Sequence, residues 1–304
     1  MRILLTGGAG FIGSHVAEAY LAEGHDVRVI DNLATGRRAN VPAVARLHEV
    51  DILSPEVETI FAEFRPEVVN HFAAQASVKV SANDPVLDLQ VNGGGTARIA
   101  QLAARHGSQK LIYAASGGTA YGQPRFLPIT EEHPLEPVSN YGASKLAGEL
   151  YVRLTARTQG LDFTILRYGN AYGPRQNPHG EAGVVAIFTG LMLAGQPCTI
   201  DGDGEQRKDY IYVGDMARAN ILALEKGSGG TYNVGTGDGI TVNQIFKTLS
   251  DATGNTVEPR HGPSRVGDVR DFWLDSSLAE RDLGWRPQTS FEEGIRRTVE
   301  SFRG

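Results

Sequence analysis

A tyrosine and a lysine four residues apart, Tyr141 and Lys145 in the stretch SNYGASKLAGELY, have the residue types for acid–base chemistry. The apolar spacing around them predicts an amphipathic helix, and positions i and i+4 lie on one face of a helix. A free phenol has a pKa of about 10 and is a poor base at neutral pH. A neighbouring ammonium favours the phenolate, which would let Tyr141 act as a general base. Because such pairs also occur by chance on exposed helices, the surrounding sequence has to support the interpretation.

Three glycines, Gly7, Gly10 and Gly13, follow a short apolar run at the start of the chain, in the stretch TGGAGFIGS. The pattern predicts a strand followed by a helix whose first turn presents unpaired amides to a pyrophosphate. Asp31 closes the next apolar run, where a carboxylate accepts ribose hydroxyls and repels the 2′-phosphate of NADP. These residues predict a dinucleotide site that favours NAD, although the arginines at 37–38 are close enough to soften that preference.

The elements that must position these residues follow from an alternation of apolar runs and helical segments. Several runs are rich in Val and Ile and lack polar alternation, which is typical of parallel strands buried on both faces. Strand–helix alternation of this kind predicts an α/β fold, a Rossmann-type doubly wound parallel sheet. We expect strands at Arg2–Leu5, Asp26–Ile30, Leu47–Val50, Glu67–Phe72, Lys110–Ala115 and Phe163–Arg167.

After about residue 170 the pattern changes, because Gly and Pro cluster and the apolar runs become shorter. We therefore expect residues 1–168 to form the NAD-binding domain and residues 169–304 to form a smaller α/β substrate-binding region. The segment 208–228 again has the pattern of a strand followed by a helix, so we expect it to rejoin the first domain.

Residues near the ends of the predicted strands would line the cofactor channel. Asp51 and Ile52 lie where an adenine ring would sit, and the amide of Asn92 would either orient backbone near the site or cap a helix. His71 lies inside an apolar run and is expected to be structural. The set predicted to hold the cofactor is Gly7, Gly10, Phe11, Ile12, Gly13, Asp31, Asn32, Asp51, Ile52, Phe72, Ala73, Ala74, Gln75, Asn92, Tyr141, Lys145 and Tyr168.

Composition narrows the class of protein. The chain has 304 residues and a net charge of −6, with scattered basic residues, which gives no indication of a nucleic-acid or membrane surface. The single cysteine, Cys198, excludes an internal disulfide and is expected to be a buried core residue in a strand. No apolar run has the length of a signal peptide core or a membrane span. We expect a cytoplasmic protein without a metal site.

With these motifs together, the chain resembles the extended short-chain dehydrogenases/reductases, in particular the nucleotide-sugar epimerases. The resemblance covers nearly the whole length. It rests on TGGAGFIGSH, DNLATG, HFAAQASV, YGASK, LRYGNAYGPRQ, GDGEQRKDYIYVGDMARA, YNVGTG and PSRVGDVRDFWLD. It implies reversible C4 epimerisation of a UDP-hexose, UDP-glucose or UDP-galactose, through a transient 4-keto sugar and bound NAD. It also implies a homodimer formed through two helices per subunit, with 96–106 and 141–158 as candidates.

The resemblance also assigns a third catalytic residue. Ser116 would share a substrate hydroxyl with Tyr141, which gives the catalytic set Tyr141, Lys145 and Ser116. In many relatives this serine lies four residues before a Tyr-Gly pair, whereas here it lies five residues before, with the glycines at 117–118 between. Thr119 is therefore an alternative source of the hydroxyl.

The substrate residues are also implied by the resemblance. Arg207 and Arg265 would bind the diphosphate, helped by Asn170, because the guanidinium fork pairs with phosphate oxygens. Asp268 would hold a ribose hydroxyl, and Phe272 would limit the room beside the 2-substituent of the sugar. The set is Ser116, Tyr141, Asn170, Gly183, Val184, Arg207, Arg265, Asp268 and Phe272, with Gly183 and Val184 at the uracil.

Two other functions remain open at this point. Family dehydratases carry an Asp–Glu pair, and decarboxylating relatives a Ser–Glu pair, where this chain has Gly117 and Gly118. A 4-keto nucleotide-sugar reductase needs only the same tyrosine and lysine, so it remains an alternative. A non-catalytic NAD-binding sensor is the second alternative, and the presence of both Tyr141 and Lys145 argues against it.

Overall fold

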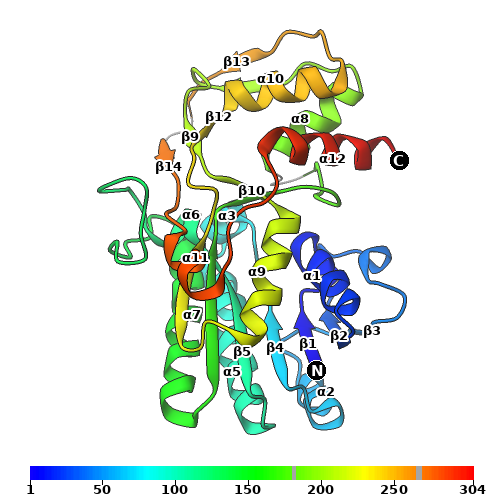
Figure 1. Ribbon diagram of the computed structural model, residues 1–304, viewed down its shortest axis with the longest axis vertical. Coiled ribbons are helices and arrows are strands. Elements are labelled where there is room, and N and C mark those ends of the chain that lie inside the picture. Colours follow the sequence, from blue (N-terminus) through cyan, green and yellow to red (C-terminus); the bar gives the residue numbers. More distant parts are fainter. Residues whose placement is uncertain (180–182, 265–268) are drawn as a thin grey trace.

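The computed structural model describes residues 1–179, 183–264 and 269–304 (Figure 1). At its centre is a seven-stranded parallel sheet in the order β11–β6–β5–β4–β1–β2–β3. This confirms the predicted Rossmann-type sheet, and each of the six predicted strands matches within one residue at either end. The strands are β1 Arg2–Thr6, β2 Asp26–Asp31, β3 Arg46–Glu49, β4 Val68–His71, β5 Lys110–Ser116, β6 Asp162–Tyr168 and β11 Gly230–Val234.

Two helical layers cover the sheet, because its strands carry apolar side chains on both faces. In β1, Ile3 and Leu5 pack into one layer and Leu4 into the other, and all three are fully buried. The first layer contains α1 Phe11–Ala22, α9 Val213–Glu225 and α11 Ser277–Leu283; the second contains α2 Glu56–Phe64, α5 Thr96–Arg105 and α7 Asn140–Gln159. The carboxyl ends of the strands are left open to the rest of the chain.

A buried chain of polar side chains joins α9 to the sheet. The Asn70 amide on β4 donates to the Tyr20 hydroxyl and to Asn220 Oδ1, both at 2.8 Å. Asn220 on α9 in turn donates to the Tyr168 hydroxyl on β6 at 2.8 Å. Such a network stabilises the fold only when its members are paired with one another. These contacts support our proposal that residues 208–228 belong with the NAD-binding half, to which β11 also contributes a strand.

The remaining chain forms a second region above the carboxyl edge of the sheet (Figure 1). Its helices α8 Val184–Leu193, α10 Val242–Thr253 and α12 Phe291–Arg303 share one apolar core. Cys198 is buried in that core, as expected, but it lies just before β8 rather than in a strand, and burial raises the pKa of its thiol to about 11. The short strands are β7 Asn170–Tyr172, β8 Thr199–Asp201, β9 Arg207–Lys208, β10 Tyr210–Tyr212, β12 Ile240–Thr241, β13 Arg260–Gly262 and β14 Asp271–Phe272.

One helix of the second layer is interrupted by a wider turn. The chain passes from α4 Pro85–Leu89 through a π-helical segment, η2 Gln90–Gly95, directly into α5. Turns of this type are uncommon and are frequent at functional sites. The other short elements are η1 Arg38–Asn40, α3 Val78–Asn83 and α6 Gly117–Ala120.

None of the helices in the described part of the chain has the length and apolar character required to cross a membrane. Within the same residues, no three His, Cys, Asp or Glu side chains gather in a way that could hold a metal ion.

Candidate active site

The loop between β1 and α1 brings bare backbone to the carboxyl edge of the sheet. Gly7 has φ +72°, and a Cβ there would lie 2.6 Å from the Ala73 amide nitrogen. A Cβ on Gly13 would lie 2.2 Å from the Gly7 carbonyl oxygen, so this glycine lets helix and loop pack closely. Gly10 differs, because among the described residues its Cβ would meet only the Gly7 oxygen, at 3.2 Å. Space beside Gly10 is what an approaching pyrophosphate requires.

The start of α1 is suited to an anion. Gly10 is the N-cap and offers no side-chain cap, and the first turn holds no acidic residue. The first amides of a helix have no partner within the helix, and they carry its positive partial charge. The residues predicted at this turn, Phe11, Ile12 and Gly13, therefore present their amides where the phosphates of a dinucleotide would lie.

Acidic residues stand at the carboxyl ends of the neighbouring strands. Asp31, only 8% exposed, ends β2; its Oδ2 accepts from the Ala9 amide and its Oδ1 from the Leu33 amide, both at 2.9 Å. These bonds hold the carboxylate beside the glycine loop. Asp51 lies after β3, and its Oδ2 accepts from the side-chain amide of Asn32, which follows β2, at 2.7 Å. This bond joins two more of the predicted cofactor residues. Ile52, the residue after Asp51, is buried.

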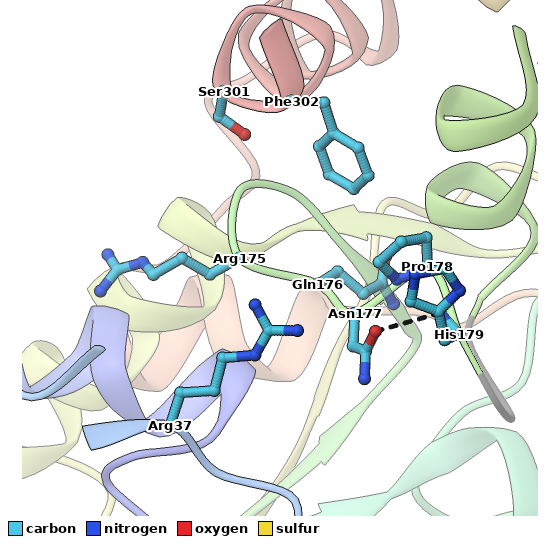
Figure 2. A pocket seen from close by; sticks show the side chains of 8 residues that line it. All are labelled: Arg37, Arg175, Gln176, Asn177, Pro178, His179, Ser301 and Phe302. Atoms are coloured by element: carbon cyan, nitrogen blue, oxygen red, sulfur yellow. Dashed lines mark hydrogen bonds between the residues drawn. The ribbon is translucent and has the colours of Figure 1, made fainter. Parts of the chain in front are cut away.

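A hollow of about 370 Å³ lies beyond this edge, between the loop after β2, the loop after β7 and the end of α12 (Figure 2). Arg37 and Phe302 point toward it, whereas Arg175 extends away toward α1, where it pairs with Glu18 at 3.1 Å. Arg38 is paired with the Glu49 carboxylate instead. Neither Tyr141 nor Lys145 lines this hollow. It is bordered by Arg37, Arg175, Gln176, Asn177, Pro178, His179, Ser301 and Phe302.

Below the loop that follows β4, His71 is held between two hydroxyls. Its Nδ1 lies 2.6 Å from Thr6 Oγ1 and its Nε2 lies 3.1 Å from Thr96 Oγ1. Burial, together with the nearby Lys145 ammonium, lowers the pKa of His71 to about 3, so the ring is neutral. These contacts support the expected structural role. Above it, Phe72 stacks on Tyr168, with ring centroids 6.3 Å apart.

Asn92 has an orienting role rather than a capping one. It lies in the π-helical segment η2, and its Oδ1 accepts from the Gln75 amide at 2.9 Å. Its Nδ2 donates to the Gln75 carbonyl at 3.0 Å and lies 3.0 Å from Ser144 Oγ on α7. Asn92 therefore joins the loop after β4, which includes Ala73, Ala74 and Gln75, to the helix that carries Tyr141.

Tyr141 and Lys145 lie at the start of α7, as predicted. The helix begins at Asn140, and its Ser139 N-cap accepts from the amide of the residue after Tyr141. The Lys145 ammonium is buried and lies 4.4 Å from the centre of the Tyr113 ring. The Tyr113 hydroxyl donates to the Lys145 carbonyl at 3.1 Å, so the ring is fixed beneath the ammonium. A cation over an aromatic face is stabilised by the charge distribution of the ring.

The titration of this pair is set mainly by burial. Burial raises the pKa of Tyr141 to about 12, and the Asp88 carboxylate adds to the rise. Burial lowers the pKa of Lys145 to about 8, against the opposing effects of Glu149 and Asp88. In the protein alone these shifts favour the neutral phenol, and the expected effect of the lysine on the phenolate stays a prediction.

Sequence reasoning missed a buried carboxylate that raises the pKa of Lys145 against the effect of burial. Glu149, one turn further along α7, forms a double hydrogen bond with Arg167 on β6, at 3.0 and 2.7 Å. Both side chains are almost fully buried, and Arg167 also donates to the Tyr121 hydroxyl at 2.9 Å. The signal was the spacing, because Glu149 follows Lys145 by four residues and so lies on the same helix face.

The glycine pair after β5 has two different roles. A Cβ on Gly117 would lie 2.9 Å from Leu274 Cδ1, so its bareness lets the second region pack against the strand end. A Cβ on Gly118 would meet nothing closer than Asn170 Oδ1 at 3.7 Å, with Phe272 at 4.0 Å. Gly118 thus faces two of the predicted substrate residues, and its missing side chain leaves room between them.

The two candidate hydroxyls differ in their surroundings. Ser116 is partly exposed at the end of β5, and its side chain does not cap α6. The Thr119 hydroxyl is buried and has no hydrogen-bond partner among the described residues. Both lie at the carboxyl edge of the sheet, Ser116 at the end of β5 and Thr119 in α6.

The other predicted substrate residues lie in the second region. Gly183 is the N-cap of α8, and Val184 begins that helix. Arg207 is exposed on β9, and its backbone amide donates to the Arg270 carbonyl at 3.0 Å. Arg265 and Asp268 fall outside the residues that the structure describes.

Comparison with known proteins agrees with this geometry. Residues 3–235 match the model of the "NAD dependent epimerase/dehydratase family". The chain is 42% identical to the UDP-glucose 4-epimerase of Mycolicibacterium smegmatis, with 100% of this chain and 99% of the relative covered. It is 48% identical to two solved UDP-glucose 4-epimerases, that of Thermotoga maritima with UDP-glucose (TM-score 0.98) and that of Thermus thermophilus in complex with NAD (TM-score 0.95). Each covers 100% of this chain and 99% of the solved one. This chain therefore belongs to the NAD dependent epimerase/dehydratase family.

Proposed function

We propose that this protein interconverts UDP-glucose and UDP-galactose by inverting the configuration at C4, using NAD that stays bound. The observation that carries the proposal is the placement of Tyr141 and Lys145 at the same sheet edge as the bare glycine loop, on a helix that packs against α6, where the glycines at 117–118 stand in place of a dehydratase acid pair. The relatives of known structure, one with UDP-glucose and one with NAD, support the same substrate and cofactor.

The residues present fit NAD. The uncapped first turn of α1 suits the pyrophosphate, and Asp31 suits a ribose with free hydroxyls rather than a 2′-phosphate. Oxidised NAD accepts a hydride reversibly and adds a positive charge, which is the chemistry that it supplies when bound. The aromatic pair Phe72–Tyr168 and the loop held by Asn92 would form the wall of the channel.

Tyr141 is the proposed base that takes the proton of the 4-hydroxyl and later returns it. For this it must reach the phenolate near neutral pH, although the protein alone raises its pKa. Lys145 is protonated below its own pKa of about 8, and a charged ammonium beside the phenol favours the phenolate. Ser116 or Thr119 would donate to or accept from the same substrate oxygen.

Substrate residues follow from the placement of the second region. Asn170 and Phe272, which both lie near the space left by Gly118, would contact the sugar and its phosphate linkage. Gly183 and Val184 would contact the uracil, and Arg207 would pair with the diphosphate. Arg265 and Asp268, outside the described residues, keep their proposed roles at the diphosphate and the ribose.

A homodimer is the proposed assembly. Six exposed apolar side chains lie on α4 and α7, which pack against each other: Val86, Leu87, Leu89, Leu150, Tyr151 and Leu154. Exposed apolar patches of this kind mark association surfaces. We therefore propose α4 together with α7 as the surface, in place of the expected pair 96–106 and 141–158, since the large apolar side chains of α5 are buried. The single buried cysteine supports our proposal of a cytoplasmic location.

The test is conversion of nucleotide sugars without added reductant. The purified protein is incubated separately with UDP-galactose, with UDP-N-acetylgalactosamine, and with a 4-keto nucleotide sugar plus NADH, and the products are separated by chromatography. We expect UDP-glucose to form from UDP-galactose and NAD to be released when the protein is denatured. Consumption of NADH with the 4-keto sugar and no conversion of UDP-galactose would instead establish the reductase.

A further inference from the structure

A buried aspartate, Asp88, lies on a helix that packs against α7 and acts electrostatically on Tyr141 and Lys145, but it belongs to neither the glycine loop nor the catalytic set. It is on α4, and its side chain is fully buried. Its Oδ1 accepts from Gln75 Nε2 at 2.7 Å and from Asn92 Nδ2 at 3.1 Å. Its Oδ2 is also buried and has no hydrogen-bond partner among the described residues. A half-satisfied buried carboxylate costs free energy, so a functional reason is expected.

The position of Asp88 depends on the π-helical segment that follows it. Asp88 and Asn92 are four residues apart on one buried face, and Asn92 continues the network to Ser144 Oγ at 3.0 Å. Ser144 donates to the Tyr141 carbonyl at 3.0 Å. The carboxylate is therefore linked through two side chains to the first turn of α7, and through Gln75 to the loop after β4.

The groups that face Tyr141 and Lys145 come from four elements besides α4. Glu149 on α7 forms a double hydrogen bond with Arg167 on β6, and its carboxylate also raises the pKa of Lys145. His71 on β4 is uncharged, and the pKa of Tyr113 on β5 lies well above its usual value, so neither carries charge near neutral pH. Asp88 is the carboxylate of this group without a cationic hydrogen-bond partner among the described residues.

We propose that Asp88 is a positioning residue whose buried charge acts on Tyr141 and Lys145 together while its Oδ1 holds Gln75 and Asn92 in place. A negative charge at this point keeps protons on both groups. It preserves the ammonium of Lys145 at higher pH and holds the phenol of Tyr141 protonated until NAD and substrate are bound. The kinetic part of this inference rests on the proposed epimerase function.

The test compares Asp88→Asn and Asp88→Ser with the unaltered holoenzyme. Removing the charge lowers the pKa of both groups, so both limbs of the pH profile of kcat/KM for UDP-galactose move to lower pH, by about one unit. The titration of the phenol is followed in parallel through the ¹³Cζ shift of labelled tyrosine, with the Tyr141 signal identified by its loss in Tyr141→Phe. This second measurement needs no turnover and is expected to move in the same direction.

Asp84→Asn is the matched control, since Asp84 is exposed and caps the same helix, accepting from the Leu87 amide at 2.9 Å. Its profile and phenol titration should stay at the wild-type positions. A slower Asp88→Asn enzyme with unmoved limbs and an unmoved phenol titration would overturn the proposal, and so would failure of both neutral variants to fold. A wild-type protein that converts no nucleotide sugar would refute the epimerase function, and the phenol titration would then decide the role of Asp88 alone.

Discussion

At the scale of single residues, the site places a phenol and an ammonium where water is largely excluded. Burial raises the pKa of Tyr141 to about 12 and lowers that of Lys145 to about 8, so in the protein alone the phenol is neutral near neutral pH while the ammonium keeps its proton only below about pH 8. The Tyr113 ring at 4.4 Å and the Glu149 carboxylate offset part of that cost for the ammonium. The pair is thus held ready to respond to a charge that arrives with the cofactor.

Replacing Tyr141 by phenylalanine removes the proton acceptor and leaves the ring volume unchanged. We expect kcat for UDP-galactose to fall by at least ~100-fold, the usual contribution of a positioned general base. Bound NAD should remain at the wild-type level, measured by absorbance after denaturation. Conversion at close to the wild-type rate would show that another group is the base.

A second prediction at this scale concerns acid stability and His71. The folded pKa is about 3 and the unfolded value is 6.5, so the unfolded chain binds more protons between these two limits. The stability that depends on a neutral His71 is therefore fully present above about pH 6.5 and is lost progressively as the pH falls toward 3. The melting temperature of wild type should fall steadily across this window, and that of His71→Asn should fall less steeply. Equal slopes in the two proteins, with exposed His179→Asn as a control, would contradict the assignment.

At the scale of elements, the strand ends and their following turns do most of the positioning. The continuous apolar runs were sufficient to predict six strands, because a parallel sheet buried on both faces leaves that pattern. Tyr141, Lys145 and the glycine loop were also accessible, since each depends on local spacing. Asp88 was not, because its place beside Lys145 comes from packing between distant helices and from a π turn that a 3.6-residue period does not encode. Nor did the sequence distinguish the roles of Gly117 and Gly118.

Alanine at each of these two glycines separates packing from substrate binding. Gly117→Ala should lower the free energy of unfolding by about 1–3 kcal/mol, because the new methyl overlaps the Leu274 side chain. Gly118→Ala should keep the wild-type melting temperature but reduce kcat/KM by roughly tenfold, since the methyl occupies space beside Asn170. Thermal unfolding and steady-state kinetics measure the two effects. Similar losses of stability in both variants would refute the separation.

At the scale of the whole molecule, one region forms the parallel sheet with its helices and the other lies over the carboxyl edge of that sheet (Figure 1). Asp209, buried at the junction, accepts from the Thr236 amide at 2.8 Å and from the Leu274 amide at 3.1 Å. These bonds hold the segments around Thr236 and Leu274 against the end of the sheet. Residues from both regions therefore lie near Gly118. The outer face of α7 takes no part in this junction and is free for association.

Charge placed on that face should separate the subunits. Leu150→Glu combined with Leu154→Glu puts two carboxylates on the exposed apolar surface of α7, where Leu150 is 61% exposed. We expect sedimentation velocity to show a monomer with wild-type circular dichroism. Val44→Glu, a change at an isolated exposed position, should leave the dimer intact. A wild-type chain that sediments as a monomer would contradict the proposed assembly.

The π turn at Gln90–Gly95 has a consequence for how this protein can change over evolution. Each residue of a helix advances the chain by about 100°. Deletion of one of the glycines at 93–95 would restore a regular helix. The residues before the deletion, including the buried aspartate, would then rotate about the helix axis onto a different face. Substitutions on the outward surface of this helix can therefore accumulate, while its length is fixed, and insertions or deletions are expected to be found only outside Pro85–Arg105.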